Sequence, residues 1–124
     1  MENVGRPAVW VGHVALRTAD PVRSGDFMLT LGMREIFKGD DVWVLELRGG
    51  THLILLRDAE ATPGDADFDL MVEDLEAAHQ SFRDRGYTVT DIERGRIHDS
   101  FQITEPGGNR ITFNSTHVED HGLV

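Results

Sequence analysis

The side chains of this sequence that could do chemistry are histidines and carboxylates. Three of the six histidines, His13, His52 and His98, lie in or beside segments with the pattern of strands. Neutral imidazole and carboxylate oxygen are ligands for divalent transition metals, and imidazole also exchanges protons near neutral pH. The sequence has no cysteine, which excludes disulfides, thiolate nucleophiles and cysteine-based zinc or iron–sulfur sites. Any metal centre in this chain would therefore use His, carboxylate and water.

The other histidines and the common catalytic motifs offer less. His79 lies on the apolar face of a predicted helix, which is typical of a packing histidine. His117 and His121 belong to a C-terminal tail, 117–124, and His117 would reach a site only if the tail folded over it. The sequence contains no glycine-rich phosphate loop, no Gly-x-Ser-x-Gly elbow and no His-Glu-x-x-His helix.

The elements that must position these side chains begin with a strand and a helix. Segment 9–18 mixes β-branched and apolar residues as strands do. Asp20 is an N-cap followed by a proline, and Gly32 ends the helix. We expect the buried side of this helix to carry Val22, Met28, Leu29 and Leu31. Three further strands are predicted at 33–38, 42–47 and 51–57.

The same order of elements restarts after an acidic linker at 59–66 that contains proline and glycine. A strand is predicted at 68–72. Asp74 then caps a helix whose apolar residues recur at i, i+3, i+4 and i+7, and Gly86 ends it. Three more strands are predicted at 87–92, 100–104 and 110–114, with a turn at 105–108 before the last.

The two halves form an internal repeat. The helix caps Asp20 and Asp74 differ by 54 positions, as do the helix stops Gly32 and Gly86. After the third strands the offset rises to 58, as between Gly50 and Gly108. The sequence predicts one α+β domain over 1–124, with repeat one at 9–58 and repeat two at 67–116.

The charge of the chain restricts its partners. Asp and Glu number 22 against 12 Lys and Arg, which gives a net charge of -10. A nucleic-acid partner is excluded because phosphate binding needs a basic surface. The charge fits a cationic ligand, a metal or a role in solubility alone. The sequence shows no membrane-spanning apolar run and no signal peptide, so we expect a cytoplasmic protein with no membrane partner.

Three motifs, at 12–16, 68–75 and 105–111, carry a resemblance to a known family. With the two βαβββ repeats, they resemble the vicinal oxygen chelate superfamily, which includes glyoxalase I, extradiol dioxygenases, fosfomycin-resistance enzymes and bleomycin-binding proteins. Asp99-Ser100-Phe101 is most similar to the fosfomycin-resistance branch. The resemblance implies a curled mixed-sheet cup that encloses a cavity, and a homodimer.

The resemblance also implies a divalent metal (Mn, Fe, Ni, Co or Zn) on inward-facing strand positions. His13 stands at the position of the family's first-strand His ligand. Asp67 stands 54 residues later, where a His is usual, and Thr112 stands where a Glu is usual. Threonine is a poor ligand for these metals, so the usual set is broken. His52 shares a strand face with Ile54, the usual ligand position there, and is predicted as a compensating ligand.

Other polar residues are candidates for the same cup. His98 is a candidate general acid or base, provided that it faces inward. Glu46 alternates with its apolar strand neighbours, so it is either the missing catalytic or ligating carboxylate or a solvent-exposed residue. Ser100, Thr112 and Asn114 are candidates to hydrogen-bond a substrate.

Two classes of function follow. The first is a metal-dependent lyase, isomerase or dioxygenase that acts on a small oxygenated organic molecule through a metal held by His13 and His52, with Asp67 or Glu46 as third ligand. The second is a metal-free antibiotic-binding protein of the bleomycin-resistance type. The two histidines favour the enzyme, whereas Thr112 and the negative charge favour the binding protein. Reaction, substrate and metal stay open at this point.

Overall fold

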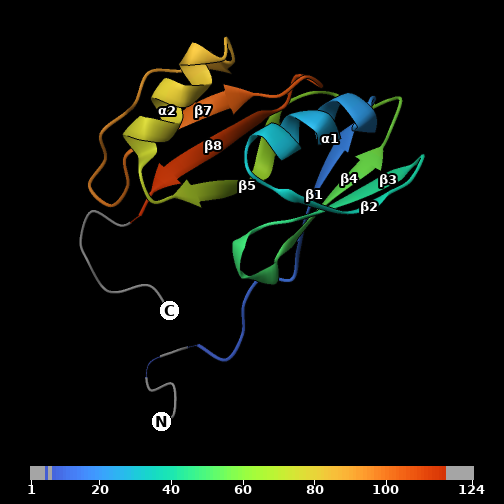
Figure 1. Cartoon of the computed structure of the whole chain (residues 1–124), viewed down its shortest axis with the longest axis horizontal. Helices are drawn as coiled ribbons and strands as arrows, with labels where there is room; N and C mark the ends of the chain where they lie inside the picture. Colours follow the sequence, from blue (N-terminus) through green and yellow to red (C-terminus); the bar gives the residue numbers. More distant parts are fainter. Residues whose placement is uncertain (1–4, 6, 117–124) are drawn as a thin grey trace.

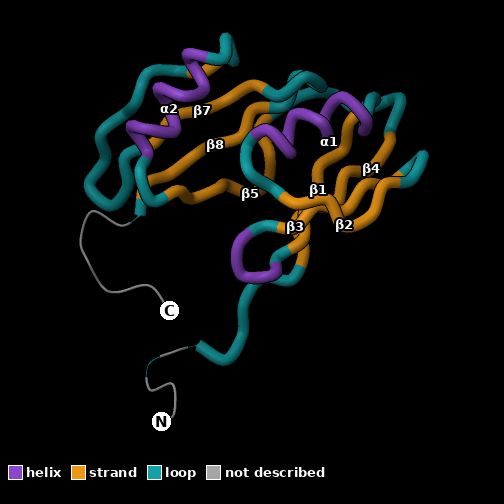
Figure 2. Tube along the Cα trace, viewed as in Figure 1, coloured by secondary structure: helices purple, strands orange, loops and turns teal. Residues whose placement is uncertain are grey.

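A computed structural model describes residue 5 and residues 7–116. The described part contains two α-helices and eight strands, arranged as two units of similar form (Figures 1 and 2). In chain order the elements are β1 His13–Thr18, α1 Pro21–Thr30, β2 Arg34–Lys38, β3 Val42–Glu46, a 3-10 turn at Arg48–Gly50, β4 His52–Arg57, β5 Asp65–Val72, α2 Leu75–Asp84, β6 Thr88–Val89, β7 Ser100–Thr104 and β8 Arg110–Ser115.

The strands form two four-stranded mixed sheets with the same topology. Their orders are β1-β4-β3-β2 and β5-β8-β7-β6. In each sheet the first strand pairs parallel with the last, and the other pairs are antiparallel. The predicted pair of βαβββ units is therefore confirmed. The helices differ by 54 positions, and β7 and β8 follow β3 and β4 by 58.

Both helices begin and end as the sequence predicts. The carboxylate of Asp20 accepts a hydrogen bond from the backbone N–H of Arg23, and Asp74 caps α2 in the same way. Gly32 and Gly86, just after each helix, have φ values of 107° and 79°, which an L side chain rarely adopts. The caps and stops thus fix the two helices at equivalent places in each repeat.

The buried face of α1 differs from the expected one. Met28 is buried and Leu31 is half-buried, but Val22 and Leu29 are exposed. Pro21, Ser24 and Gly25 occupy the buried face together with Met28. The reason is the indole of Trp43 on β3, which lies so close to Gly25 that a Cβ there would overlap the ring.

Each sheet packs one face against its helix. In the first sheet this face carries Trp43, Leu45, Leu53 and Leu55, and in the second it carries Phe101, Ile103, Ile111 and Phe113. Side chains at alternate positions point to the opposite side, which we call the open face because no described element covers it. The strands β1 and β5 contact each other, so the two sheets meet along these edges (Figure 1).

Three predicted strands have bounds that differ from the observed ones by more than one residue. The strand at 9–18 begins only at His13, where pairing with β4 starts, and Val9 and Trp10 before it are 81% and 74% exposed. The strand at 87–92 shortens to two residues that pair with β7. The strand at 68–72 extends back to Asp65, inside the predicted linker. Periodicity cannot locate such ends, because they depend on where a neighbouring strand offers a partner.

A buried carboxylate joins the two repeats. Glu105, in the turn between β7 and β8, is 2% exposed. Its Oε1 accepts a hydrogen bond of 2.6 Å from the hydroxyl of Ser24 on α1. Its Oε2 accepts two more from Asn109, from the backbone N–H at 3.0 Å and from Nδ2 at 2.9 Å. Helix α1 of repeat one is thereby tied to the last turn of repeat two.

Asn109 extends this junction to both edge strands. Its Nδ2 also donates to the backbone carbonyl of Arg17 on β1, at 3.2 Å. Its Oδ1 accepts from the backbone N–H of Gly64, next to β5, at 3.2 Å. Because the side-chain amide of Asn109 bonds to both edge strands, it fixes how the two open faces meet.

Neither described helix is long and apolar enough to cross a bilayer.

Candidate functional site

A row of four ionisable side chains crosses the open face of the first sheet. His13 on β1 pairs in register with His52 on β4, and His52 pairs with Glu46 on β3. Glu46 in turn pairs with Arg34 on β2. These four residues, the first-sheet row, span all strands of the sheet because each stands at the open-face position of the same register line.

Three contacts link the members of this row. The imidazole rings of His13 and His52 are stacked, with centroids 5.7 Å apart and planes 10° apart. His52 Nε2 lies 3.7 Å from Oε2 of Glu46, and Oε1 of Glu46 accepts a hydrogen bond from the guanidinium of Arg34. The side chains of His52 and Glu46 are 31% and 22% exposed, so the centre of the row is partly shielded from water.

The imidazoles and the carboxylate of this row are suitable ligands for a divalent metal. Their arrangement matches that of a metal site only in part. Two ligand atoms on one tetrahedral ion, each about 2.1 Å from it, lie about 3.4 Å apart. The 3.7 Å between His52 and Glu46 is close to that spacing. Residues 5 and 7–116 contain no group of three His, Cys, Asp or Glu side chains already converged on one point. A three-ligand site therefore needs His13 to rotate out of its stack with His52.

The predicted ligand Asp67 and the predicted contact residue Thr112 lie in the second sheet. Asp67 is on the open side of β5, within an irregular stretch of its pairing with β8. Thr112 pairs with Asp69 on β5 and with Gln102 on β7, whose Nε2 donates to the threonine hydroxyl at 3.3 Å. At the positions equivalent to His13 and His52 the second sheet thus carries Asp67 and Arg110, and Thr112 is equivalent to Ile54.

Ser100 and Asn114 are neighbours on this second open face. They pair in register across β7 and β8. Both are half-buried. Neither side chain has a hydrogen-bond partner among residues 5 and 7–116. The structure therefore brings the three predicted contact residues Ser100, Thr112 and Asn114 together on one surface.

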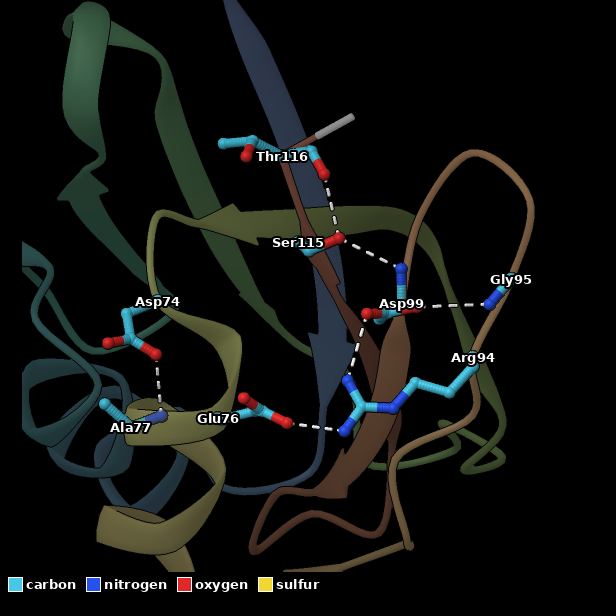
Figure 3. A network of polar contacts seen from close by, with 8 residues as sticks. All are labelled: Asp74, Glu76, Ala77, Arg94, Gly95, Asp99, Ser115 and Thr116. Atoms are coloured by element: carbon cyan, nitrogen blue, oxygen red, sulfur yellow. Dashed lines mark hydrogen bonds and ion pairs between the residues drawn. The ribbon is translucent and has the colours of Figure 1, made fainter. Parts of the chain in front are cut away.

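His98 lies just before β7 and is held against the end of β8. Its Nδ1 is 2.8 Å from the backbone carbonyl of Ser115. The adjoining loop is fastened by Arg94, whose guanidinium lies between the carboxylates of Glu76 on α2 and Asp99 (Figure 3). The hydrogen bond to Glu76, followed by the one to Asp99, raises the pKa of Arg94. The proton-transfer role of His98 stays a prediction.

The other histidines divide in two groups. His79 is buried on α2, as a packing histidine should be: its Nε2 lies 2.7 Å from the carbonyl of Thr90, and its ring meets Phe101 edge-on at 4.8 Å. His117 and His121 lie outside the described residues.

Three clefts border the second open face, and the one of about 260 Å³ lies at the junction of the repeats, lined by Asp65, Asp67 and Asn109 among others. A cleft of about 770 Å³ lies between the repeats and is lined by Asp67, Asp69 and Met71 of β5 and by Val11 and Thr51 of repeat one, among others. Its rim is crossed by an ion pair of 3.3 Å between Arg48 and Glu73. A smaller one of about 210 Å³ lies beside β7. Concave, partly apolar surfaces of the size of the largest cleft are the usual place for small-molecule sites.

The fold and the paired open faces agree with one family. The family model for the Glyoxalase/Bleomycin resistance protein/Dioxygenase superfamily matches residues 10–113. The chain belongs to this superfamily. Its members commonly bind divalent metals and small molecules. No curated protein matches the sequence of the chain.

Solved structures with different activities share this fold. A lactoylglutathione lyase from Agrobacterium tumefaciens has 18% identity and a TM-score of 0.75, over 89% of this chain and 96% of that one. The oxidase ChaP-H2 has 17% identity and a TM-score of 0.74, over 94% and 100%. A bleomycin resistance determinant encoded on the transposon Tn5 has 16% identity and a TM-score of 0.72, over 87% and 98%.

Likeness at this level shows the fold alone, since one scaffold carries many activities. The relatives include a lyase, an oxidase and a resistance determinant, so they do not select a reaction. The finer resemblance to the fosfomycin-resistance branch stays a prediction.

Sequence reasoning missed three polar residues that the structure brings forward. Arg34 holds Glu46, Gln102 holds Thr112, and Glu105 joins the repeats. Arg34 and Gln102 occupy ordinary polar positions of alternating strands, which carry no signal of a partner. Glu105 lies in the turn motif that carries the family resemblance, but its burial depends on α1, which is far away in sequence.

Proposed function

We propose that this protein acts on a small oxygenated organic molecule through a divalent metal held by His13 and His52 on the open face of the first sheet. The observation that carries this is the first-sheet row, in which two imidazoles and one carboxylate stand on adjacent strands. Two imidazoles and a carboxylate suit Mn, Fe, Co, Ni or Zn and leave positions open for substrate oxygens. Such a metal supplies Lewis-acid stabilisation of developing negative charge.

The other residues have supporting roles in this proposal. Glu46 is favoured over Asp67 as the third ligand, because one of its oxygens is 3.7 Å from His52, whereas Asp67 belongs to the other sheet. Arg34 holds Glu46 in the row before the metal arrives. His98 moves a proton, and Ser100, Thr112 and Asn114 orient the substrate. A lyase, an isomerase or a dioxygenase remains the reaction class.

The test is metal binding by chelator-treated protein, titrated separately with Mn²⁺, Fe²⁺, Co²⁺, Ni²⁺ and Zn²⁺ and followed by calorimetry. We expect saturation at one ion per chain for at least one metal. His13→Ala with His52→Ala should weaken binding at least ~100-fold, and Glu46→Gln by ~10- to 100-fold. Asp67→Asn is the matched control and should leave the affinity unchanged.

Three outcomes would contradict parts of this proposal. Substoichiometric binding of every metal would overturn the metal-dependent function. Metal binding that survives the double histidine substitution would overturn the ligand assignment. Loss of binding in Asp67→Asn, with Glu46→Gln unaffected, would transfer the third ligand to the second sheet.

A second candidate is a metal-free binding protein for a small organic molecule of the antibiotic kind. The observation in its favour is that Arg34 already occupies Glu46, while Thr112 offers no carboxylate. The wider cleft carries Asp67, Asp69 and Glu73, which favour a cationic ligand. This candidate predicts saturable binding of a cationic drug such as bleomycin by the chelator-treated protein, unchanged in the double histidine variant. A homodimer and a cytoplasmic location stay predictions under both candidates.

A further inference from the structure

The geometry of the second sheet points to a site of its own. We propose that its open face binds a neutral, polyhydroxylated molecule, a sugar or another polyol, through Ser100, Gln102, Thr112 and Asn114. The inference deepens the proposed function by naming the chemical class that these residues take. It rests on the binding of a small organic molecule and is independent of any metal.

The four side chains form a regular grid. Asn114 and Ser100 make one register line across β8 and β7, and Thr112 and Gln102 make the next. Neighbouring strands are about 4.8 Å apart, and successive open-face positions along a strand are about 6.7 Å apart. The grid therefore presents hydroxyl and amide groups over an area that one ring-shaped ligand can cover.

The grid has unused hydrogen-bonding capacity. Gln102 donates to Thr112, and its backbone N–H donates to the hydroxyl of Thr90. Within residues 5 and 7–116, Ser100 Oγ and the amide of Asn114 have no partner, although both side chains are half-buried. Polar groups in such positions gain from a ligand that offers both donors and acceptors.

The charge of the adjoining cavity selects against anions. The cavity of about 210 Å³ beside β7 is lined by Thr90, Glu93, Ser100, Phe101, Gln102 and Thr112. None of these lining residues is basic, and the carboxylate of Glu93 can only accept hydrogen bonds when ionised. At about 30 Å³ for a water molecule, the cavity has room for roughly seven. A neutral ligand whose hydroxyls donate to Glu93 and bond with the amides satisfies this lining.

The grid differs from the open-face positions of the other strands, because its side chains are both polar and uncharged. Open positions on other strands carry other kinds of side chain: Asp65, Asp67 and Asp69 follow one another on β5, Glu46 and Arg34 belong to the first-sheet row, and Val44, Ile54 and Leu56 are apolar. Charged residues are the ordinary choice where a strand faces only water. The uncharged donors and acceptors of β7 and β8 are thus concentrated beside the cavity.

Amide side chains match vicinal hydroxyls. Asn114 offers a donor and an acceptor side by side, which can pair with one hydroxyl that accepts and its neighbour that donates. Met71 stands next to Asn114 in register and is 45% exposed, so it offers an apolar surface to the C–H groups of a ring. Sites built in this way reject analogues that lack the hydroxyls.

The experiment titrates the ¹⁵N-labelled full chain with myo-inositol and with cyclohexanol, which share a six-membered carbon ring and differ in hydroxyl number. The readout is the side-chain amide resonances of Asn114 and Gln102. We expect saturable shifts with myo-inositol, and binding of cyclohexanol that is weaker by about three- to tenfold for each hydrogen bond lost. Gluconate serves as the anionic arm and should bind more weakly, and glucosamine serves as the cationic arm and should bind no more tightly than myo-inositol.

Variants assign the binding to the grid. Ser100→Ala and Asn114→Ala should each weaken myo-inositol by about three- to tenfold, with Gln102 as the reporter. Asn114→Asp keeps the size and shape of the side chain, so a change in binding cannot be attributed to a loss of folding. This variant should shift the preference of the site from myo-inositol toward glucosamine. Arg17→Gln, at an exposed position of β1, is the control on the other sheet and should bind myo-inositol unchanged. Chelator-treated protein should bind myo-inositol as tightly as untreated protein, whether or not the chain holds a metal.

The proposal is overturned by any of three results. The first is the absence of a saturable shift with myo-inositol. The second is equal affinity for cyclohexanol, or tighter binding of glucosamine or gluconate by the unsubstituted chain. The third is binding that survives both grid substitutions, Ser100→Ala and Asn114→Ala.

Discussion

A row of side chains crosses the open face of each sheet at equivalent positions. The two rows differ in which of their residues are charged. In the first sheet the row reads His13, His52, Glu46 and Arg34 from β1 to β2. In the second the corresponding row reads Asp65, Arg110, Thr104 and Thr88 from β5 to β6. Each row contains one pair of an arginine with a carboxylate, Arg34 with Glu46 or Arg110 with Asp65. Only the first row also has two adjacent imidazoles.

The helix-facing sides of the two sheets are much more alike. Leu45, Leu53 and Leu55 correspond to Ile103, Ile111 and Phe113, all of them buried. A packed interior restricts every position to apolar residues of suitable volume, whereas an open face is restricted only by solvent and by what it binds. The repeats have therefore kept one core and acquired two different surfaces, which supports separate roles for the two faces.

The contrast is strongest at the junction. Glu105 corresponds to Leu47 at an offset of 58, and Ser24 corresponds to Ala78 at an offset of 54. A buried polar pair on one side of the molecule thus stands where apolar residues stand on the other. Leu47 and Ala78 are partly buried against the core, while Glu105 and Ser24 are joined by a 2.6 Å hydrogen bond.

Breaking the polar junction should have the largest effect on stability. Glu105→Ala leaves the Ser24 hydroxyl and two Asn109 donors without their acceptor, so we expect a loss of about 3 kcal/mol in the free energy of unfolding. Urea unfolding at constant m-value measures it. In a double-mutant cycle, Glu105→Leu and Ser24→Ala should show coupling of about 1–2 kcal/mol.

The matched control for this cycle is Leu47→Ala at the equivalent apolar position. It should destabilise through lost packing and show no coupling to Ser24→Ala. Additive effects of Glu105→Leu and Ser24→Ala would show that the polar pair does not act as a unit.

The two cores differ at one helix–strand contact, where a small residue packs against a very large one in repeat one and two medium-sized rings pack together in repeat two. Gly25 lies beneath the indole of Trp43, and the equivalent pair in repeat two is His79 and Phe101. Gly25→Ala should therefore cost about 1–3 kcal/mol through overpacking, although alanine favours helices. Adding Trp43→Phe, the residue type of repeat two, should recover part of the loss and removes an indole N–H that has no partner within the described residues. Thermal unfolding of the three variants measures this, and a neutral Gly25→Ala would refute the close packing.

The smallest expected effect concerns Tyr87, which stands where repeat one has Met33 and reaches across to α1. Its hydroxyl bonds to Thr30 at 2.8 Å; this bond, together with the nearby Arg85, lowers the pKa of Tyr87 below its ordinary value near 10. Because the folded-state pKa is depressed, the stabilisation is present above pH ~10 and is lost as the pH falls through the folded-state pKa.

Absorbance titration reads this group directly, since Tyr87 is the only tyrosine of the chain. We expect a midpoint below that of the unfolded protein. Thr30→Val should raise it toward the unfolded value, and Arg85→Gln should raise it less. A midpoint that does not respond to Thr30→Val would show that the contact between the repeats is not maintained in solution.

Local patterns were enough to predict the helices and most strands. Asp20 and Asp74 cap the two helices, and Gly32 and Gly86 end them, because each of these signals acts over a few residues. The end of a strand was harder to predict, as at residues 9–12, since it depends on the length of the neighbouring strand.

The candidate site shows the same division. That His52 and Glu46 occupy open-face positions followed from alternation and from the repeat offset. Alternation could not predict which of these side chains would touch each other, because the register between two strands is set by the packing of the whole sheet. The capture of Glu46 by Arg34 and of Thr112 by Gln102 depends on those registers and could not be predicted from one sequence.

By itself the sequence determined the repeated βαβββ order, the helix limits and the chemical types available for a site: imidazole, carboxylate and neutral amide or hydroxyl, with no thiol. These follow from local conformational preferences and from composition. The tertiary structure decided which side chains meet and which carboxylate is buried. Glu105 shows why: 81 positions separate it from Ser24, and only the docking of the two repeats turns a polar turn residue into the buried link between them.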